Sequence, residues 1–110
     1  MIRVKIKRDN GQIKSFQLKG HAESGPVGHD LVCAAVSGIT FGAVNAVLEL
    51  CNVPLEIDQA GSEGGFLKVT IEDMQPSPDL EKACLLFEGM LISLQTVEHD
   101  YSKHISIIDK

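Results

Sequence analysis

Two stretches near the start of the chain alternate apolar and polar side chains in the manner of β-strands. Residues 2–7 alternate aliphatic with basic side chains, the period-two pattern of a strand with one buried face. Asn10-Gly11 is typical of a tight hairpin turn, and we expect a second strand over residues 12–19. That strand alternates less regularly, because Ile13 falls on the opposite face from Phe16, so its register stays open.

A long apolar stretch over residues 31–50 predicts the first helix. The preceding residues 20–29 hold three glycines and a proline and predict a loop, and Asp30 offers an N-cap for the helix. Twenty such residues could also suggest a membrane span. Polar residues within the stretch, its acidic ends and the amphipathic strands on both sides favour a buried core helix, and no membrane association is expected.

Small residues recur every four positions along this helix and form one stripe. We expect the sheet or another helix to pack closely against that stripe. The stripe consists of Ala34, Gly38, Gly42 and Ala46.

The second half of the chain repeats the order of hairpin and helix. Alternating residues at 55–58 and 67–72, separated by a turn at Gly61–Gly65, predict a second hairpin. Ser77-Pro78 then begins a helix with an apolar face, and Ile105 and Ile107 suggest a closing strand. The resulting order ββαββαβ predicts a single α+β layered domain, with a mixed or antiparallel sheet and two long helices, over residues 1–110. The helix's apolar face comprises Leu80, Cys84, Phe87, Met90 or Leu91, Leu94 and Val97.

The charge is unevenly distributed between the start of the chain and the rest. The 110 residues carry 10 basic and 15 acidic side chains, a net charge of −5. Residues 1–19 hold six basic and one acidic residue, or +5, so the remainder, with four basic and fourteen acidic residues, carries −10. The net charge argues against a general nucleic-acid binder, and we expect no direct nucleic-acid partner. The acidic body favours a basic partner.

The three cysteines and the start of the sequence favour a reducing cytoplasm. An odd number of widely spaced cysteines does not suggest a disulfide framework, and no secretory segment opens the sequence. No C-x-x-C pair supports a zinc ribbon or thioredoxin-type chemistry. The glycine-rich segment 61–65 lies between two strands, which is the wrong context for a phosphate-binding loop.

Reactive side chains concentrate between the second strand and the first helix. His21 follows the strand, His29 and Asp30 precede the helix, and Cys33 is expected in the helix's first turn. A thiol in that position can have its pKa lowered from about 8.5 to roughly 3.5–7.5. Asp30 opposes this effect, so the sign of the net shift stays open.

This group of residues suits acyl transfer on a peptide. Cys33 could act as the nucleophile, and His21 could both set its protonation state and protonate the leaving amine. Free backbone amides at the helix start could hold the oxyanion. His29 is a rival base, and His21, His29 and Cys33 also form an acceptable zinc set, although their spacing matches no metal motif. Cys51 and Cys84 are expected to be buried and inert.

In addition to this chemistry, the sequence resembles the ribosomal-processing cysteine proteases called Prp, a family of small bacterial proteins. The resemblance rests on Gly20-His21-Ala22 and on Gly28-x-Asp30-x-Val32-Cys33-Ala34-Ala35-Val36-Ser37, and it extends over essentially the whole chain in length and element order. It implies a catalytic dyad of His21 and Cys33. Asp30 and Ser37 match the family's residues flanking the cysteine, and Ser37 lies one helical turn beyond Cys33.

The resemblance also implies a biological role. It indicates removal of an N-terminal extension from a large-subunit ribosomal protein, with a basic N-terminal peptide as substrate, by a cytoplasmic homodimer that needs no cofactor and no metal. The alternative is a non-catalytic ribosome-assembly or ribosome-associated binding protein with the same fold. Gly20 is grouped with Asp30 and Ser37 as a supporting or substrate-binding residue.

Overall fold

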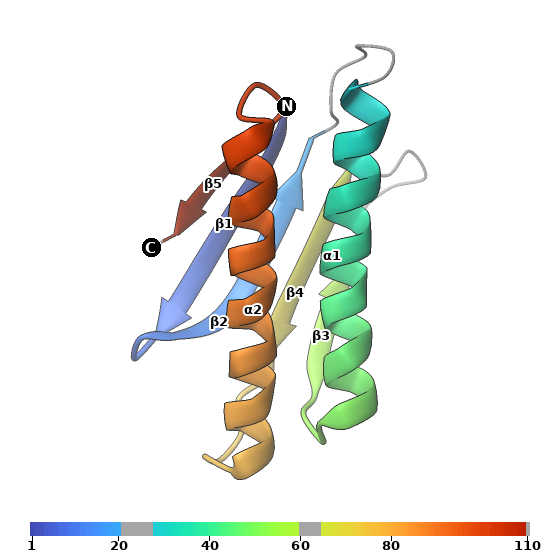
Figure 1. Cartoon of the computed structure of the whole chain (residues 1–110). Coiled ribbons are helices and arrows are strands. Elements are labelled where there is room, and N and C mark those ends of the chain that lie inside the picture. Colours follow the sequence, from blue (N-terminus) through green and yellow to red (C-terminus); the bar gives the residue numbers. More distant parts are fainter. Residues whose placement is uncertain (21–27, 60–64, 110) are drawn as a thin grey trace.

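The computed structural model describes residues 1–20, 28–59 and 65–109, which form one sheet and two long helices (Figure 1). The element order is the ββαββαβ predicted from the sequence. The elements are β1 Ile2–Asp9, β2 Gln12–Lys19, α1 Gly28–Leu50, β3 Leu55–Asp58, β4 Phe66–Ile71, α2 Pro78–Asp100 and β5 Ile105–Asp109.

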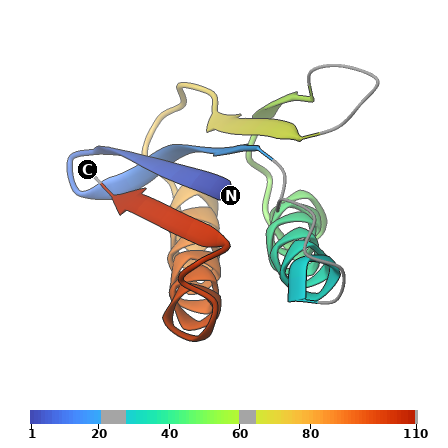
Figure 2. The ribbon, with the colours of Figure 1, turned by 90° about the horizontal axis from the view of Figure 1, so that it is seen from above.

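The five strands form a mixed sheet in the order β3-β4-β2-β1-β5. Both hairpins and the β2–β4 pair are antiparallel, whereas β5 runs parallel to β1. Both helices lie on the same side of this sheet, and no helix of the described residues covers its other face (Figure 2). This confirms the α+β prediction and gives the molecule two layers.

A register shift in the first hairpin explains the irregular pattern of the second strand. Lys7 pairs with Ser15, but the next residue, Arg8, pairs with Ile13, so Lys14 is an extra residue on β2. The shift turns Ile13 to the same buried side as Phe16, and each is only 1% exposed. Both residues therefore contribute to the core even though simple alternation separates them.

The core lies between the sheet and the inner faces of the two helices. Phe16 of β2 meets Phe87 of α2 edge to face, with ring centroids 5.1 Å apart. The helix α2 begins as predicted, because the Ser77 side chain accepts a hydrogen bond from the Leu80 amide at 3.1 Å and Pro78 occupies the first turn. Buried residues of α1 are spaced three or four apart and face this core: Val32, Val36, Thr40, Val44 and Val47.

The opposite side of α1 is exposed, and this corrects the expectation that its small-residue stripe packs within the chain. A Cβ atom added to Gly38 or Gly42 would meet nothing within 4 Å. Only 28% of the segment Leu31–Leu50, which is long and apolar enough to cross a membrane, is buried inside the chain. The helix is thus a core helix on one face only. Its exposed face includes Leu31 at 57%, Phe41 at 40% and Leu48 at 51%.

Candidate active site

Gly20 directly follows β2 and has a backbone conformation that only glycine adopts easily. Its φ is +100°, and a Cβ atom there would lie 2.5 Å from the carbonyl oxygen of Met1. Its amide donates a 2.8 Å hydrogen bond to the carbonyl of Gly65, the residue before β4. The residue before His21 is therefore fixed against two other segments. Sequence reasoning assigned Gly20 to the site but could not identify these contacts, because they depend on strand order.

The first helix begins earlier in the sequence than predicted. Two predicted site residues therefore lie farther from the helix N-terminus than expected. Because α1 starts at Gly28, Asp30 lies inside the first turn and is not the residue that precedes the helix. Cys33 is the sixth residue, in the second turn and not the first. The free helix amides belong to residues 28–31, since the amide of a sixth residue already takes part in the helical ladder. The predicted dipole effect on Cys33 is correspondingly weaker.

Cys33 is half-buried and packs against the edge of the core. Its neighbours in sequence point in different directions, because Val32 is fully buried while Leu31 and Ala34 are exposed. One side of the thiol is thus supported by apolar side chains, and the other remains accessible. A nucleophile that must meet an external peptide needs this partial exposure.

Ser37 lies one turn after Cys33 on an exposed part of α1. Its backbone carbonyl accepts a 3.4 Å hydrogen bond from the hydroxyl of Thr40, whose shorter bond, 2.8 Å, goes to the carbonyl of Val36. Thr40 is 1% exposed, so these bonds satisfy a buried polar group. The predicted supporting bond from Ser37 to the site stays a prediction.

Several predicted site groups lie outside the described part of the chain. His21 falls between the described residues 20 and 28, and the side chains of His29 and Asp30 are not described. The dyad His21–Cys33, the rival base His29 and the zinc set therefore stay predictions. Among the residues that the structure describes, no cluster of three or more His, Cys, Asp or Glu side chains could hold a metal ion.

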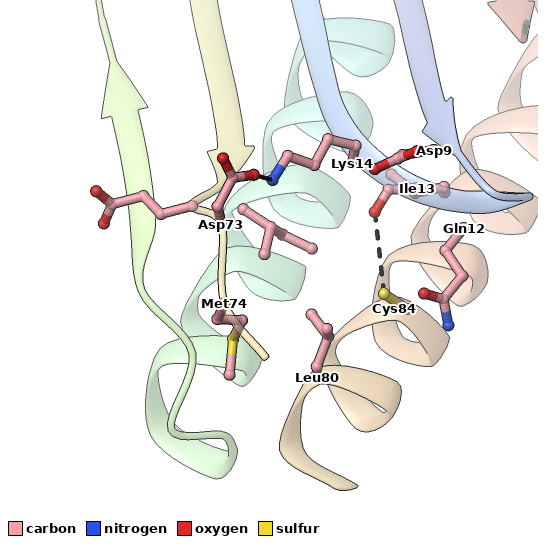
Figure 3. Close-up of a pocket in the computed structure, with 10 residues that line it drawn as sticks. Asp9, Gln12, Ile13, Lys14, Asp73, Met74, Leu80 and Cys84 are labelled. Atoms are coloured by element: carbon pink, nitrogen blue, oxygen red, sulfur yellow. Dashed lines mark hydrogen bonds and ion pairs between the residues drawn. The ribbon is translucent and has the colours of Figure 1, made fainter. Parts of the chain in front are cut away.

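The other two cysteines differ from Cys33 in burial. Cys51 is 8% exposed and Cys84 is 6% exposed, and both belong to the core. The Cys84 thiol lies 4.0 Å from the carbonyl oxygen of Ile13 (Figure 3). Burial, followed by the negative charge of Glu88, raises the pKa of the Cys84 thiol. This confirms the expectation that these two thiols are buried.

A cavity of about 320 Å³ lies at the other end of the molecule from Cys33. Ile13, Leu80 and Cys84 line its apolar side, and a 2.6 Å ion pair between Lys14 and Asp73 closes its rim (Figure 3). No predicted site residue lines it. Since the sequence motif and the accessible thiol both lie at the opposite end, we assign the candidate active site to Cys33 and not to this cavity.

Comparison with known proteins identifies relatives over almost the full length of the chain. A family described as Cysteine protease Prp matches residues 1–106. A protein of Bacillus subtilis (strain 168) named Ribosomal processing cysteine protease Prp is 39% identical over 108 residues, covering 97% of this chain and 96% of the relative. A protein of the same name from Staphylococcus aureus (strain Mu50) is 36% identical, covering 97% of each chain.

Solved structures agree with this comparison. The essential ribosomal processing protease Prp from S. aureus, crystallised with a covalently linked product peptide, superposes with a TM-score of 0.85 at 35% identity and full coverage of both chains. The same S. aureus protease with a substrate peptide gives a TM-score of 0.85 at 34% identity, again over both full chains.

Proposed function

The chain belongs to the cysteine protease Prp family and is a cysteine protease, and from this premise we propose that Cys33 and His21 cleave the N-terminal extension from a large-subunit ribosomal protein. One observation carries the choice of nucleophile. Of the three cysteines, Cys33 alone is accessible, whereas Cys51 and Cys84 are buried. A buried thiol cannot reach the carbonyl of a peptide bound from solvent.

The proposed reaction uses the two side chains in turn. The Cys33 thiolate attacks the scissile carbonyl carbon, and the oxygen of the tetrahedral intermediate takes up the negative charge. Protonated His21 gives its proton to the leaving amine, which departs and leaves a thioester on Cys33. His21 then accepts a proton from water, which attacks the thioester and releases the extension with a free carboxylate.

The surroundings of Cys33 support this role. The free amides of residues 28–31 lie one turn before the thiol and are the nearest helical donors for the oxyanion. Gly20 contacts Met1 and Gly65 at the end of β2, so the residue before His21 in the sequence is held in place. No cofactor is needed for these steps.

The substrate assignment follows from the relatives and from charge. The B. subtilis and S. aureus relatives are named ribosomal processing proteases, and an S. aureus structure contains a substrate peptide. The body of this chain after residue 19 carries −10, which favours a basic peptide such as the terminus of a ribosomal protein. We place the reaction in the cytoplasm, where ribosomal proteins are made.

Incubation with the precursor ribosomal protein, followed by mass spectrometry, tests this proposal. The wild type should release one N-terminal fragment, and Cys33→Ala should lower the rate by at least about 10³-fold. Cys51→Ala, which removes another thiol, is the control and should keep most of the activity. Cleavage by Cys33→Ala at the wild-type rate, or no cleavage by the wild type, would reject it.

We further propose that the chain acts as a homodimer joined through the exposed face of α1. That face combines apolar side chains with Gly38 and Gly42, where the chain leaves open space. Exposed apolar patches of this kind mark interaction sites, and glycines permit the close approach of a second helix. A two-fold axis would place the same face of a second copy against it.

A bulky substitution at one glycine tests whether the dimer interface lies on this face of α1. Gly42→Leu adds a side chain into open space, so the monomer should fold while the dimer dissociates in analytical ultracentrifugation. Gly89→Leu adds the same volume to an open position on α2 and is the matched control. An unchanged dimer in Gly42→Leu, or loss of the dimer in Gly89→Leu alone, would place the interface elsewhere.

A further inference from the structure

Half of the basic residues of this acidic protein lie together on the sheet face that no helix covers. The strand register places their side chains on one side, because paired residues of neighbouring strands share a face. Arg3 pairs with Lys19, and Lys5 pairs with Gln17, which in turn pairs with Lys68. We name this surface the basic sheet face; it consists of Arg3, Lys5, Lys7, Lys19 and Lys68.

Four of these five cations are exposed to an external partner, and the fifth, Lys68, is half-buried. In the described parts of the chain, none of them forms an ion pair, whereas Arg8 bonds Glu88 and Asp109, and Lys14 bonds Asp73. The side chains of Arg3, Lys5, Lys7 and Lys19 are exposed. None of the five belongs to the hydrophobic core or to the predicted site residues.

Acidic side chains lie at two margins of this surface: Asp9 at the end of β1, two residues beyond Lys7, and two residues of β3. Glu56 and Asp58 project from β3 at one edge of the sheet, where Asp58 is the register partner of Lys68. The centre of the positive charge therefore lies over β1 and β2. Successive basic residues of β1 are two positions apart, or about 6.8 Å, so they form a straight row.

We propose that the basic sheet face binds the phosphate backbone of a single-stranded segment of RNA. The choice of RNA rests on the proposed function, because a protease that processes ribosomal proteins works where ribosomal RNA is present. A row of unpaired cations suits a chain of phosphates, and the neutral polar side chains between them can bond sugars and phosphates. Those side chains include Gln17, Thr70 and Ser106.

The composition of the face disfavours an anionic membrane as the partner. Surfaces that enter a bilayer combine basic residues with several large apolar side chains. Here Phe66, opposite Lys19, and Ile108, opposite Lys5, are the large apolar side chains on the described face. One aromatic ring fits stacking on a base better than insertion into lipid. The net charge of −5 gives no indication of this basic surface. For that reason the composition alone predicted no nucleic-acid partner.

Fluorescence anisotropy with a labelled single-stranded RNA of mixed sequence tests the proposal. Lys5→Gln/Lys7→Gln should weaken binding about tenfold at low salt and lower the slope of log K against log salt by about 1.4, for two lost phosphate contacts. Lys82→Gln/Lys103→Gln removes the same charge away from the sheet face and should bind as the wild type does.

Three results would overturn it: no RNA binding at low salt, equal loss in both double variants, or tighter binding to phosphatidylserine vesicles than to RNA. Peptide cleavage measured on the same variants keeps the two proposals distinct. Lys5→Gln/Lys7→Gln should cleave a short substrate peptide at the wild-type rate. Cys33→Ser should still bind RNA. A wild type that cleaves the peptide but does not bind RNA rejects the RNA surface alone, whereas a wild type that binds RNA but does not cleave the peptide rejects the proposed cleavage by Cys33 and His21.

Discussion

The two helices each carry a cysteine at nearly the same distance from their N-terminal ends, yet the two thiols have different surroundings. Cys33 is the sixth residue of α1, and Cys84 is the seventh residue of α2. Any effect of the helix dipole is therefore similar for both. Cys33 is half-buried near one end of the molecule, whereas Cys84 is 6% exposed near the other, against the carbonyl of Ile13.

This comparison shows that a position near a helix start does not by itself make a thiol reactive. Burial and the carboxylate of Glu88 raise the pKa of Cys84, so the thiol form dominates there at neutral pH. Cys33 differs by its accessible side and by the motif that brings His21 and Asp30 into the same segment. The difference between the accessible Cys33 and the buried Cys84 thus depends on tertiary contacts.

Thiol alkylation should show the largest difference between the two positions. At pH 7.5 we expect iodoacetamide to label Cys33 about 100-fold faster than Cys84, because the reagent can reach a half-buried thiol more easily than a buried one. Peptide mapping by mass spectrometry measures each site. Since the pKa of Cys84 is raised, its labelling should increase only at higher pH. Equal rates at all three cysteines would remove the distinction.

Substitution of Gly20 should disturb the Cys33 end of the molecule specifically. Gly20→Ala places a Cβ against the Met1 carbonyl at a positive φ, and we expect a loss of about 2–3 kcal/mol in the free energy of unfolding. Gly11→Ala is the matched control, since Gly11 also has a positive φ, +81°, but open space around its Cβ position. Urea denaturation gives the free energies, and cleavage should fall in Gly20→Ala more than in Gly11→Ala. Equal effects of the two substitutions would mean that the contact with Met1 is unimportant.

The smallest effect concerns the ion pairs near Cys84. Arg8 bonds Glu88 of α2 and Asp109 of β5, and the hydrogen bond and charge of Arg8 hold the pKa of Asp109 below its usual value. Arg8→Gln should cost about 1 kcal/mol at pH 7. A lowered carboxyl pKa stabilises the fold above about pH 4 and ceases to do so as the pH falls through the folded value.

Melting temperatures at pH 7 and pH 3 measure this contribution. The difference between the wild type and Arg8→Gln should shrink at pH 3, while cleavage at pH 7 should be unchanged. A difference that stays constant or grows on acidification would contradict the role assigned to Asp109.

Much of the fold follows from local patterns, and the exceptions have physical causes. The alternation of residues 2–7, the Asn10-Gly11 turn and the Ser77 cap each predict their element correctly, because neighbours in sequence determine them. Ile13 is buried because of the bulge at Lys14. That bulge arises from the pairing of β1 with β2, so the local sequence pattern did not predict it. The prediction missed the start of α1 at Gly28 because aspartate is a favoured N-cap residue, so the helix was expected to begin after Asp30.

The family was predictable from the sequence motif, whereas the contacts around Gly20 were not. The motif containing Gly20 and Cys33 identifies the family, and the roles of its side chains stay predictions. The contact of Gly20 with Met1 and the basic sheet face depend on which strands are neighbours, and a net charge of −5 gives no indication of the latter. The positions of charged residues on the folded surface, and not the net charge alone, are needed to predict which partners the protein binds.

The identity of the reacting thiol is tested most directly by trapping it with a substrate. A peptide with the sequence before the cut site, ending in a chloromethyl ketone, should alkylate the nucleophile that binds it. Tandem mass spectrometry should find the peptide on Cys33 alone, and competition with uncleaved substrate peptide should prevent the reaction. Attachment to Cys51 or Cys84, or labelling of Cys33 that substrate does not slow, would contradict the assignment of Cys33 as the catalytic nucleophile.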